Sequence, residues 1–175
     1  MDMDIQEITL QEILPRTIIY LRCRGPWRQL PDMIEKLDDY VSTMQILTTG
    51  PSSGIYYNTP DEVDVQGLEW EVFYPVTPNE PEVSDTKAGI GIRNLPETNF
   101  ASIFHKGSYQ KAGSSYERLK KWIKQEGYKI AGPLEEVYVS TFGIPSDEQT
   151  MEIRIPLYFH NKKQILIKSI LQDDS

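Results

Sequence analysis

Blocks of residues in the first half of this chain recur, in the same order, about 82 residues later. The Gly50-Pro51 pair shows the spacing, because its counterpart Gly132-Pro133 lies 132 − 50 = 82 positions on. The matched blocks are Gly25-Pro26-Trp27 with Gly107-Ser108-Tyr109, Ile34–Leu37 with Tyr116–Leu119, Gly50-Pro51 with Gly132-Pro133 and, at a spacing of 81, Trp70–Pro75 with Met151–Pro156. A duplicated unit too small to bury its own apolar face must pack against its copy. We therefore predict two similar halves, with a pocket at the seam between them.

Composition excludes several classes of function. The chain has 175 residues and a formal net charge of −8. Phosphate binding relies on clustered Lys and Arg, so this charge argues against direct binding to nucleic acid. Cys23 is the single cysteine, which excludes an intrachain disulfide, and no His–Cys–carboxylate spacing predicts a metal site. No phosphate-binding loop or dinucleotide motif is present, so no cofactor is predicted.

The N-terminal sequence gives no sign of export. Met1-Asp2-Met3-Asp4 is acidic and lacks the regions of a signal peptide. No apolar run reaches the length that crosses a bilayer. We expect a cytoplasmic protein that does not bind a membrane.

The pattern of apolar residues predicts the same order of elements in each half. Three-four spacing predicts amphipathic helices over residues 29–46 and 109–126, and runs of β-branched and aromatic residues predict strands around them. The expected strands span residues 5–14, 17–24, 54–58, 68–76, 89–95, 99–106, 136–142 and 151–157. Residues 77–87, rich in Pro and acids, are predicted to link the halves. Residues 161–171 are predicted to add an edge strand or docking segment.

Short connections favour antiparallel pairing, with the helices on one side of a sheet. The predicted fold class is α+β: duplicated strand-helix-strand-strand units form a curved antiparallel sheet, and two helices flank a central cleft. The predicted domain spans residues 1–158, with repeats over about 4–76 and 88–158, followed by a C-terminal extension over 159–175.

With the repeat laid out, the chain resembles the GyrI-like small-molecule-binding family, the effector-binding domain of multidrug-responsive bacterial transcription regulators. The resemblance covers about residues 4–158. It is carried by Arg24-Gly25-Pro26-Trp27, Gly54–Glu62, His105–Tyr109, Tyr116–Leu119, Ala131-Gly132-Pro133 and Glu136-Val137-Tyr138. It implies a ligand cleft between the two helices, with Glu136 as the cleft acid. Some members are fused to a DNA-binding helix-turn-helix, for which this chain has no room, so the resemblance implies a stand-alone ligand-binding protein.

The two copies differ at one position that matters for chemistry. Gly54 of the first half corresponds to Glu136 of the second, which predicts one carboxylate near the seam. An acid beside aromatic rings can pair with a ligand cation while the rings stack on its apolar body. Burial would raise the pKa of such an acid unless a cation lies beside it. Glu135 points to the opposite face by the two-residue period of a strand, so we expect its Gln variant to bind normally and to serve as the internal control.

Aromatic residues at equivalent places are predicted to form the remaining pocket. Tyr56 and Tyr138 are mates in the two copies and should approach each other in the cleft. The full predicted ligand-binding set is Glu136, Tyr138, Tyr56, Trp27, Tyr109, Trp70 and Phe104, and no catalytic residue is assigned. Glu69 and Glu71 are interpreted as a solvated strand face and His105 as a structural residue.

Three functions stay open at this point, and whether the chain is an enzyme is left undecided. The first is binding of hydrophobic, often cationic, small molecules for sequestration or sensing. The second is hydrolysis of an electrophilic small molecule, with Glu136 as general base and Tyr56 or Tyr138 as acid, as a minority of the family implies. The third is a gyrase-inhibitor-like module that binds a basic protein partner. Its candidate acids are Asp61, Glu62, Asp64, Glu80, Glu82 and Asp85.

Overall fold

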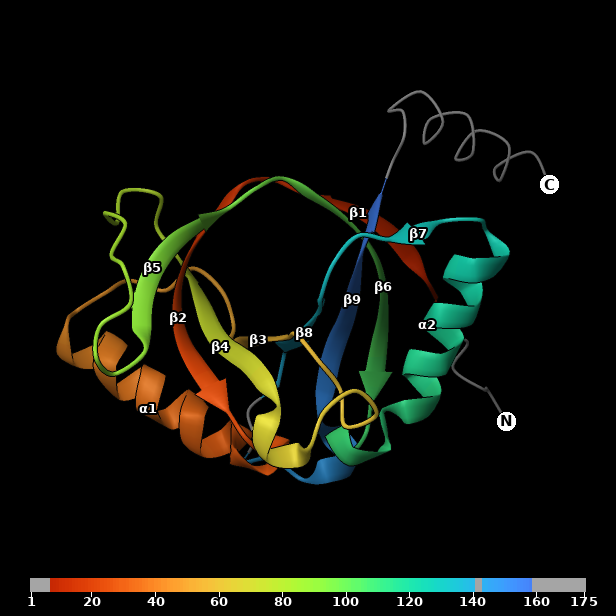
Figure 1. The fold of residues 1–175 in the computed structure, drawn as a ribbon, viewed down its shortest axis with the longest axis horizontal. Coiled ribbons are helices and arrows are strands. Elements are labelled where there is room, and N and C mark those ends of the chain that lie inside the picture. The colour runs from red at the N-terminus through yellow and green to blue at the C-terminus, as the bar shows by residue number, and fades with distance from the viewer. Residues whose placement is uncertain (1–6, 141–142, 159–175) are drawn as a thin grey trace.

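The computed structural model describes residues 7–140 and 143–158 (Figure 1). The start of the first predicted strand, the end of the strand predicted over 136–142, and the predicted edge or docking segment over 161–171 lie wholly or partly outside the described residues. No described helix is long and apolar enough to cross a membrane.

The two halves of the chain have the same order of elements. The first half contains β1 (Thr9–Ile13), β2 (Arg16–Arg24), α1 (Leu30–Thr43), β3 (Ser53–Tyr56) and β4 (Glu69–Val76). The second contains β5 (Ile90–Leu95), β6 (Thr98–Lys106), α2 (Gly113–Gln125), β7 (Lys129–Ile130), β8 (Leu134–Tyr138) and β9 (Thr150–Tyr158). Short 3₁₀ turns recur at matching places: η1 (Trp27–Gln29), η2 (Val65–Gly67), η3 (Tyr109–Lys111) and η4 (Ser146–Glu148). The strand β7 was not predicted from the sequence.

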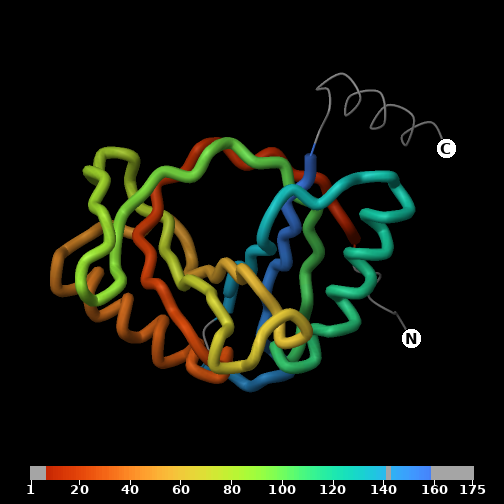
Figure 2. Tube along the Cα trace, in the orientation of Figure 1, coloured from red at the N-terminus to blue at the C-terminus, as the bar shows by residue number. Residues whose placement is uncertain are grey.

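The strands of the described residues form an antiparallel sheet in the order β1-β6-β9-β8-β3-β4-β2-β5, with β7 paired to β9. This arrangement, with α1 and α2 flanking it, confirms the predicted α+β class (Figure 1). The consecutive strands β1 and β2 do not pair with each other. Instead, β1 pairs with β6 of the second half, and β5 pairs with β2 of the first half. Figure 2 shows the red and green traces passing between the halves at these two points.

The seam between the halves is the pairing of β3 with β8. In this antiparallel register Gly54 lies opposite Glu136, and Ser53 lies opposite Val137. Gly54 therefore faces its own counterpart in the repeat, since 54 + 82 = 136. Such a register is what a twofold relation between the halves would require, and superposition of the halves stays a prediction.

Side chains are buried on both faces of the sheet, which the sequence pattern did not indicate. On the helix side, α1 buries Ile34, Leu37 and Val41, while α2 buries Leu119 and Ile123. The opposite side holds a smaller apolar cluster of Ile18, Tyr20, Ile55 and Phe73.

Charged residues are also buried on that second face. The interpretation of Glu71 as part of a solvated face is wrong, because its side chain is buried and its Oε2 lies 2.6 Å from Nη2 of Arg93. Glu69 is exposed, as predicted. The segment 77–87 is largely exposed, but it also contacts the sheet edge, where Val83 pairs with Ile92 and the Tyr20 hydroxyl donates to Asp85.

Candidate functional site

A pocket of about 600 Å³ opens between the N-terminal ends of the two helices. Its volume is within the range of small-molecule sites. The lining comes from η1 and the start of α1, from η3, and from the ends of β3 and β8. The lining residues are Trp27, Arg28, Leu30, Pro31, Tyr56, Ser108, Tyr109, Gln110, Glu136, Tyr138, Ser146 and Gln149.

Two aromatic walls are built in the same way in the two halves. Gly25 and Gly107 both have positive φ, at 112° and 121°, a backbone conformation that favours glycine. Each glycine turns the chain out of a strand so that an aromatic residue follows two positions later. Trp27 then packs edge-on against Tyr56 with ring centroids 5.4 Å apart, and Tyr109 packs against Tyr138 at 5.7 Å.

The floor of the pocket is the tyrosine pair of β3 and β8. The hydroxyls of Tyr56 and Tyr138 are hydrogen-bonded to each other, and both side chains are buried. Burial raises the pKa of each hydroxyl well above its ordinary value, so both remain protonated. The pair can meet because Gly54 has no side chain: a Cβ there would lie 2.9 Å from the Tyr138 oxygen and 2.9 Å from Cε2 of Tyr56.

Glu136 is the acid of this pocket. Desolvation raises the pKa of its carboxyl from 4.5 to about 7, while hydrogen bonds from the hydroxyls of Tyr116 and Tyr56 act in the opposite direction. No Lys or Arg is among the described groups that act on this pKa. The carboxyl is surrounded by protein, yet part of the residue remains accessible from the pocket. Near neutral pH the site thus holds a carboxyl group poised between its neutral and charged forms.

When Glu136 is charged, the hydroxyls of this cluster donate their protons in a fixed order. A carboxylate only accepts hydrogen bonds, so the Tyr56 hydroxyl must donate when it binds Glu136. A hydroxyl has one proton, which leaves the Tyr56 oxygen to accept from Tyr138. The order is therefore Tyr138 to Tyr56 to Glu136.

Five of the seven predicted ligand-binding residues line this pocket: Glu136, Tyr138, Tyr56, Trp27 and Tyr109. Trp70 does not line it. Its ring is buried behind Tyr56, stacked at 6.2 Å, and its Nε1 donates to the carbonyl of Gly25. It supports the wall rather than forming the surface.

Phe104 was placed in the pocket wrongly. It lies on β6 between Ile103 and His105, which face the helix side, so its own side chain projects from the opposite face and is 49% exposed. His105 is structural, as interpreted, because its ring nitrogens contact the Ser115 hydroxyl and the Ser108 carbonyl.

Seven of the twelve lining residues and Tyr116 were missed from the sequence, and three of these eight matter for the chemistry of the site: Tyr116, Arg28 and Gln110. Tyr116 reaches Glu136 from α2, on the same helix face as the buried residues Leu119 and Ile123. The repeat held a signal for Tyr116: its counterpart in the first half is the apolar Ile34 (116 − 34 = 82), so a hydroxyl is present in one copy alone. Arg28 and Gln110, which also correspond in the repeat, line the mouth of the pocket, and exposed polar residues carry no periodicity that would reveal this.

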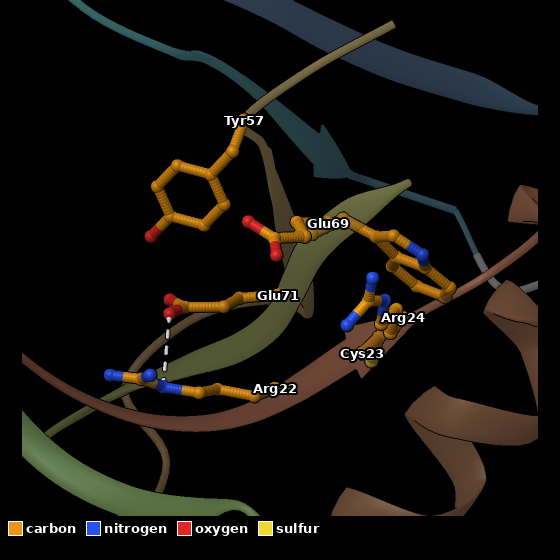
Figure 3. A pocket seen from close by; sticks show the side chains of 7 residues that line it. Arg22, Cys23, Arg24, Tyr57, Glu69 and Glu71 are labelled. Carbon is orange, nitrogen blue, oxygen red and sulfur yellow. Dashed lines mark ion pairs between the residues drawn. The ribbon is translucent and has the colours of Figure 1, made fainter. Parts of the chain in front are cut away.

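A second hollow, of about 500 Å³, lies on the other face of the sheet beside Tyr57 (Figure 3). Arg22 and Glu71, two of the four charged residues that line it, form ion pairs within the chain. Figure 3 shows Glu71 beside Arg22, with an Nε–Oε1 distance of 3.9 Å, and the Arg22 Nε also lies 2.9 Å from Asp85. Because these groups are already paired, we assign the ligand site to the pocket between the helices.

Comparison with known proteins decides the family. The GyrI-like small molecule binding domain matches this chain over residues 6–158. The chain belongs to this family. No curated protein resembles it closely enough in sequence to count as a relative.

Solved structures share the fold of this GyrI-like domain. The EcmrR C-terminal domain has a TM-score of 0.75 at 19% identity, over 88% of this chain and 98% of that one. In the EcmrR–DNA complex the chain spans 57% of the EcmrR chain. A hydrolase encoded by lin2189 from Listeria innocua has a TM-score of 0.66 at 9% identity, over 87% and 92% of the two chains. SAV2435, bound to tetraphenylphosphonium, has a TM-score of 0.57 at 16% identity, over 87% and 99%. At identities this low, the likeness to these structures shows a shared fold alone.

Proposed function

We propose that this GyrI-like domain binds lipophilic cations in the pocket between its two helices, for sensing or sequestration. The observation that carries the proposal is the buried Glu136, which has aromatic rings on both sides and no described Lys or Arg acting on its charge. A delocalised cation can replace the missing charge partner and stack on Trp27 and Tyr109. The tetraphenylphosphonium bound to SAV2435 is a ligand of this class, which supports the same assignment here.

Titration calorimetry with tetraphenylphosphonium at pH 8 tests the proposal. Glu136→Gln keeps the size of the side chain and removes its charge, so binding should weaken by about 1.5–3 kcal/mol, the Coulomb attraction of two unit charges roughly 6–11 Å apart at an effective dielectric constant of about 20. The binding free energy of triphenylphosphine oxide, a neutral molecule of similar shape, should fall far less. Equal losses for the two molecules would reject Glu136 as the cation partner.

The control variant must change charge without changing the floor of the pocket. Glu135 does point to the opposite face, but it is a poor control because it is buried and its carboxylate binds Arg16 at 2.9 Å, so its Gln variant would disturb the fold. Glu148 is a better choice, since it is exposed in η4 between the lining residues Ser146 and Gln149. Glu148→Gln should bind tetraphenylphosphonium as the wild type does.

Hydrolysis of an electrophilic ring is the second candidate function. It is favoured by the ordered hydroxyls of Tyr138 and Tyr56 beside a carboxyl with a pKa of about 7, which suits a general base at neutral pH. The test is turnover of an epoxide probe, with Glu136→Gln and Tyr56→Phe as variants. Turnover that both variants abolish while they remain folded would establish the enzyme, and no turnover by the wild type would reject it for that probe.

The acidic interaction module stays a prediction. Two of its candidate acids are already engaged within the chain, because Glu82 accepts from Asn94 and Asp85 binds Tyr20 and Arg22.

A further inference from the structure

The two halves do not contribute equally to the pocket. Its walls are made of corresponding residues, Trp27 with Tyr109 and Tyr56 with Tyr138, but its charges are not. At the floor, Gly54 is matched by Glu136. At the mouth, Arg28 is matched by Gln110, since 110 − 28 = 82.

This asymmetry gives the pocket one negative and one positive group. Of the described lining residues, Glu136 and Arg28 are the two with acidic or basic side chains, and they come from different halves. Glu136 lies at the floor, surrounded by tyrosine hydroxyls. Arg28 lies in η1 next to the wall residue Trp27 and is exposed.

Arg28 is available for a ligand. Among the described residues Arg28 forms no ion pair and no side-chain hydrogen bond, whereas four of the five arginines on the other sheet face, Arg16, Arg22, Arg93 and Arg154, are paired with carboxylates. A guanidinium group binds a carboxylate through two parallel hydrogen bonds, which an ammonium cannot do. A ligand cation on Glu136 would leave the other end of the same ligand near the mouth.

We propose that Arg28 is a specificity-determining residue, which favours ligands with a lipophilic cation at one end and a carboxylate at the other over ligands with the cation alone. The inference rests on the proposed function, because it takes Glu136 as the site of the cation. A plain cation meets repulsion from Arg28, whereas a zwitterion pairs with both groups. Arg28 is exposed, so the effect is screened and modest.

Two dyes with one ring system separate the contributions of Arg28 and Glu136. Rhodamine B carries a free carboxylate and is a zwitterion at pH 8, while its ethyl ester is a cation. Dissociation constants are measured by fluorescence anisotropy at pH 8 and low salt. The Arg28→Gln variant should bind rhodamine B about threefold more weakly than the wild type, a loss typical of a partly exposed ion pair. The affinity of the ester for the Arg28→Gln variant should equal or exceed its affinity for the wild type. Arg28→Glu should shift the ratio of the two affinities further in the same direction.

Controls separate the inference from the proposed function. Lys111→Gln removes an exposed positive charge next to Gln110 without changing the described lining, so it should leave the ratio of affinities unchanged. If Arg28→Gln changes the affinities for both dyes equally, or changes neither affinity, the inference is overturned although cation binding stands. If neither dye binds the wild type, both the inference and the proposed function are overturned for this class of ligand.

Discussion

Gly54 and Glu136 show how one difference between corresponding residues creates the chemistry of the pocket. They face each other across β3 and β8, and the space above Gly54 is filled by the rings of Tyr56 and Tyr138. The glycine therefore makes the tyrosine pair possible, and the pair in turn orients hydroxyls toward the carboxyl of Glu136. A carboxylate on both strands would leave no space for the rings.

Gly54→Ala should weaken both folding and binding. The added methyl would lie about 2.9 Å from Tyr138 and Tyr56, so the rings must move, and overpacking of this kind costs about 1–3 kcal/mol. Urea denaturation and tetraphenylphosphonium titration measure the two effects. Gly113→Ala is the matched control, because nothing lies within 4 Å of its added methyl and alanine favours a helix. A Gly54→Ala protein as stable as the wild type would contradict the packing described for the floor.

Binding of a lipophilic cation should depend on pH through Glu136. The cation binds the carboxylate form, and with a pKa of about 7 the charged fraction rises about tenfold between pH 6 and pH 8. Tetraphenylphosphonium affinity should rise by a similar factor over this interval. Glu136→Gln should have a flat profile, and a wild-type profile equally flat would mean that the carboxyl does not titrate in this range.

The free protein should show the opposite pH trend in stability. The folded pKa of Glu136 lies above its unfolded value, so the folded state binds the proton more tightly. Its stabilising contribution is fully present below pH 4.5 and is lost as pH rises through about 7. At pH 8 Glu136→Gln should be more stable than the wild type, by on the order of 3 kcal/mol, and the difference should be smaller at pH 5. Thermal denaturation of both proteins at the two pH values would measure it.

At the scale of the elements, strands from the two halves are joined by a buried ion pair. Arg16 of β2 donates two hydrogen bonds, of 3.0 and 2.9 Å, to Glu135 of β8. Its guanidinium lies between the rings of Phe73 and Phe100, at 5.9 and 5.7 Å from their centroids. One strand, β8, thus presents Glu136 to the ligand pocket and Glu135 to a structural ion pair on the other face.

Breaking this ion pair from one side should be strongly destabilising. Glu135→Leu leaves Arg16 buried without its partner, which typically costs about 3–5 kcal/mol. The double variant Arg16→Met with Glu135→Leu should regain most of this loss, because it leaves no unpaired charge. Urea denaturation of Glu135→Leu, Arg16→Met and the double variant gives the coupling free energy between the two side chains. Additive losses would show that the two side chains do not act as a pair.

At the scale of the whole molecule, each half is completed by a strand from the other. β1 pairs with β6 and β5 pairs with β2, so neither half retains its full sheet when separated. The seam adds the pairing of β3 with β8. We therefore predict that the chain unfolds as one cooperative unit despite its repeated plan.

Residues 1–79 alone should fail to fold, as judged by circular dichroism and the absence of a cooperative urea transition. A full-length chain cut between Asn79 and Glu80, in the exposed segment 77–87, should stay associated on size exclusion, because the pairings between halves remain. A cooperative transition for residues 1–79 alone would show that the strand exchange is dispensable.

Much of this architecture can be predicted from local patterns. Three-four spacing located both helices, and the glycines at positions 25 and 107 marked the turns that place Trp27 and Tyr109. The repeat itself indicated that Tyr56, Tyr138 and Glu136 belong together, since corresponding residues meet at a seam between copies. These features depend on short stretches of chain or on the repeat, and both are visible in the sequence.

Other features depend on contacts between distant residues, and only the tertiary structure decided them. Two residues separate β1 from β2, as in a hairpin, yet β1 pairs with β6, because strand pairing is a long-range choice with no local signal. Glu71 is buried on a face that also holds its partner Arg93 and Phe73, so alternation along β4 does not distinguish inside from outside. The same limit applies to Arg28: its sequence neighbours place it in a turn, but only the packing of the two halves brings it to the mouth of a pocket whose floor is Glu136.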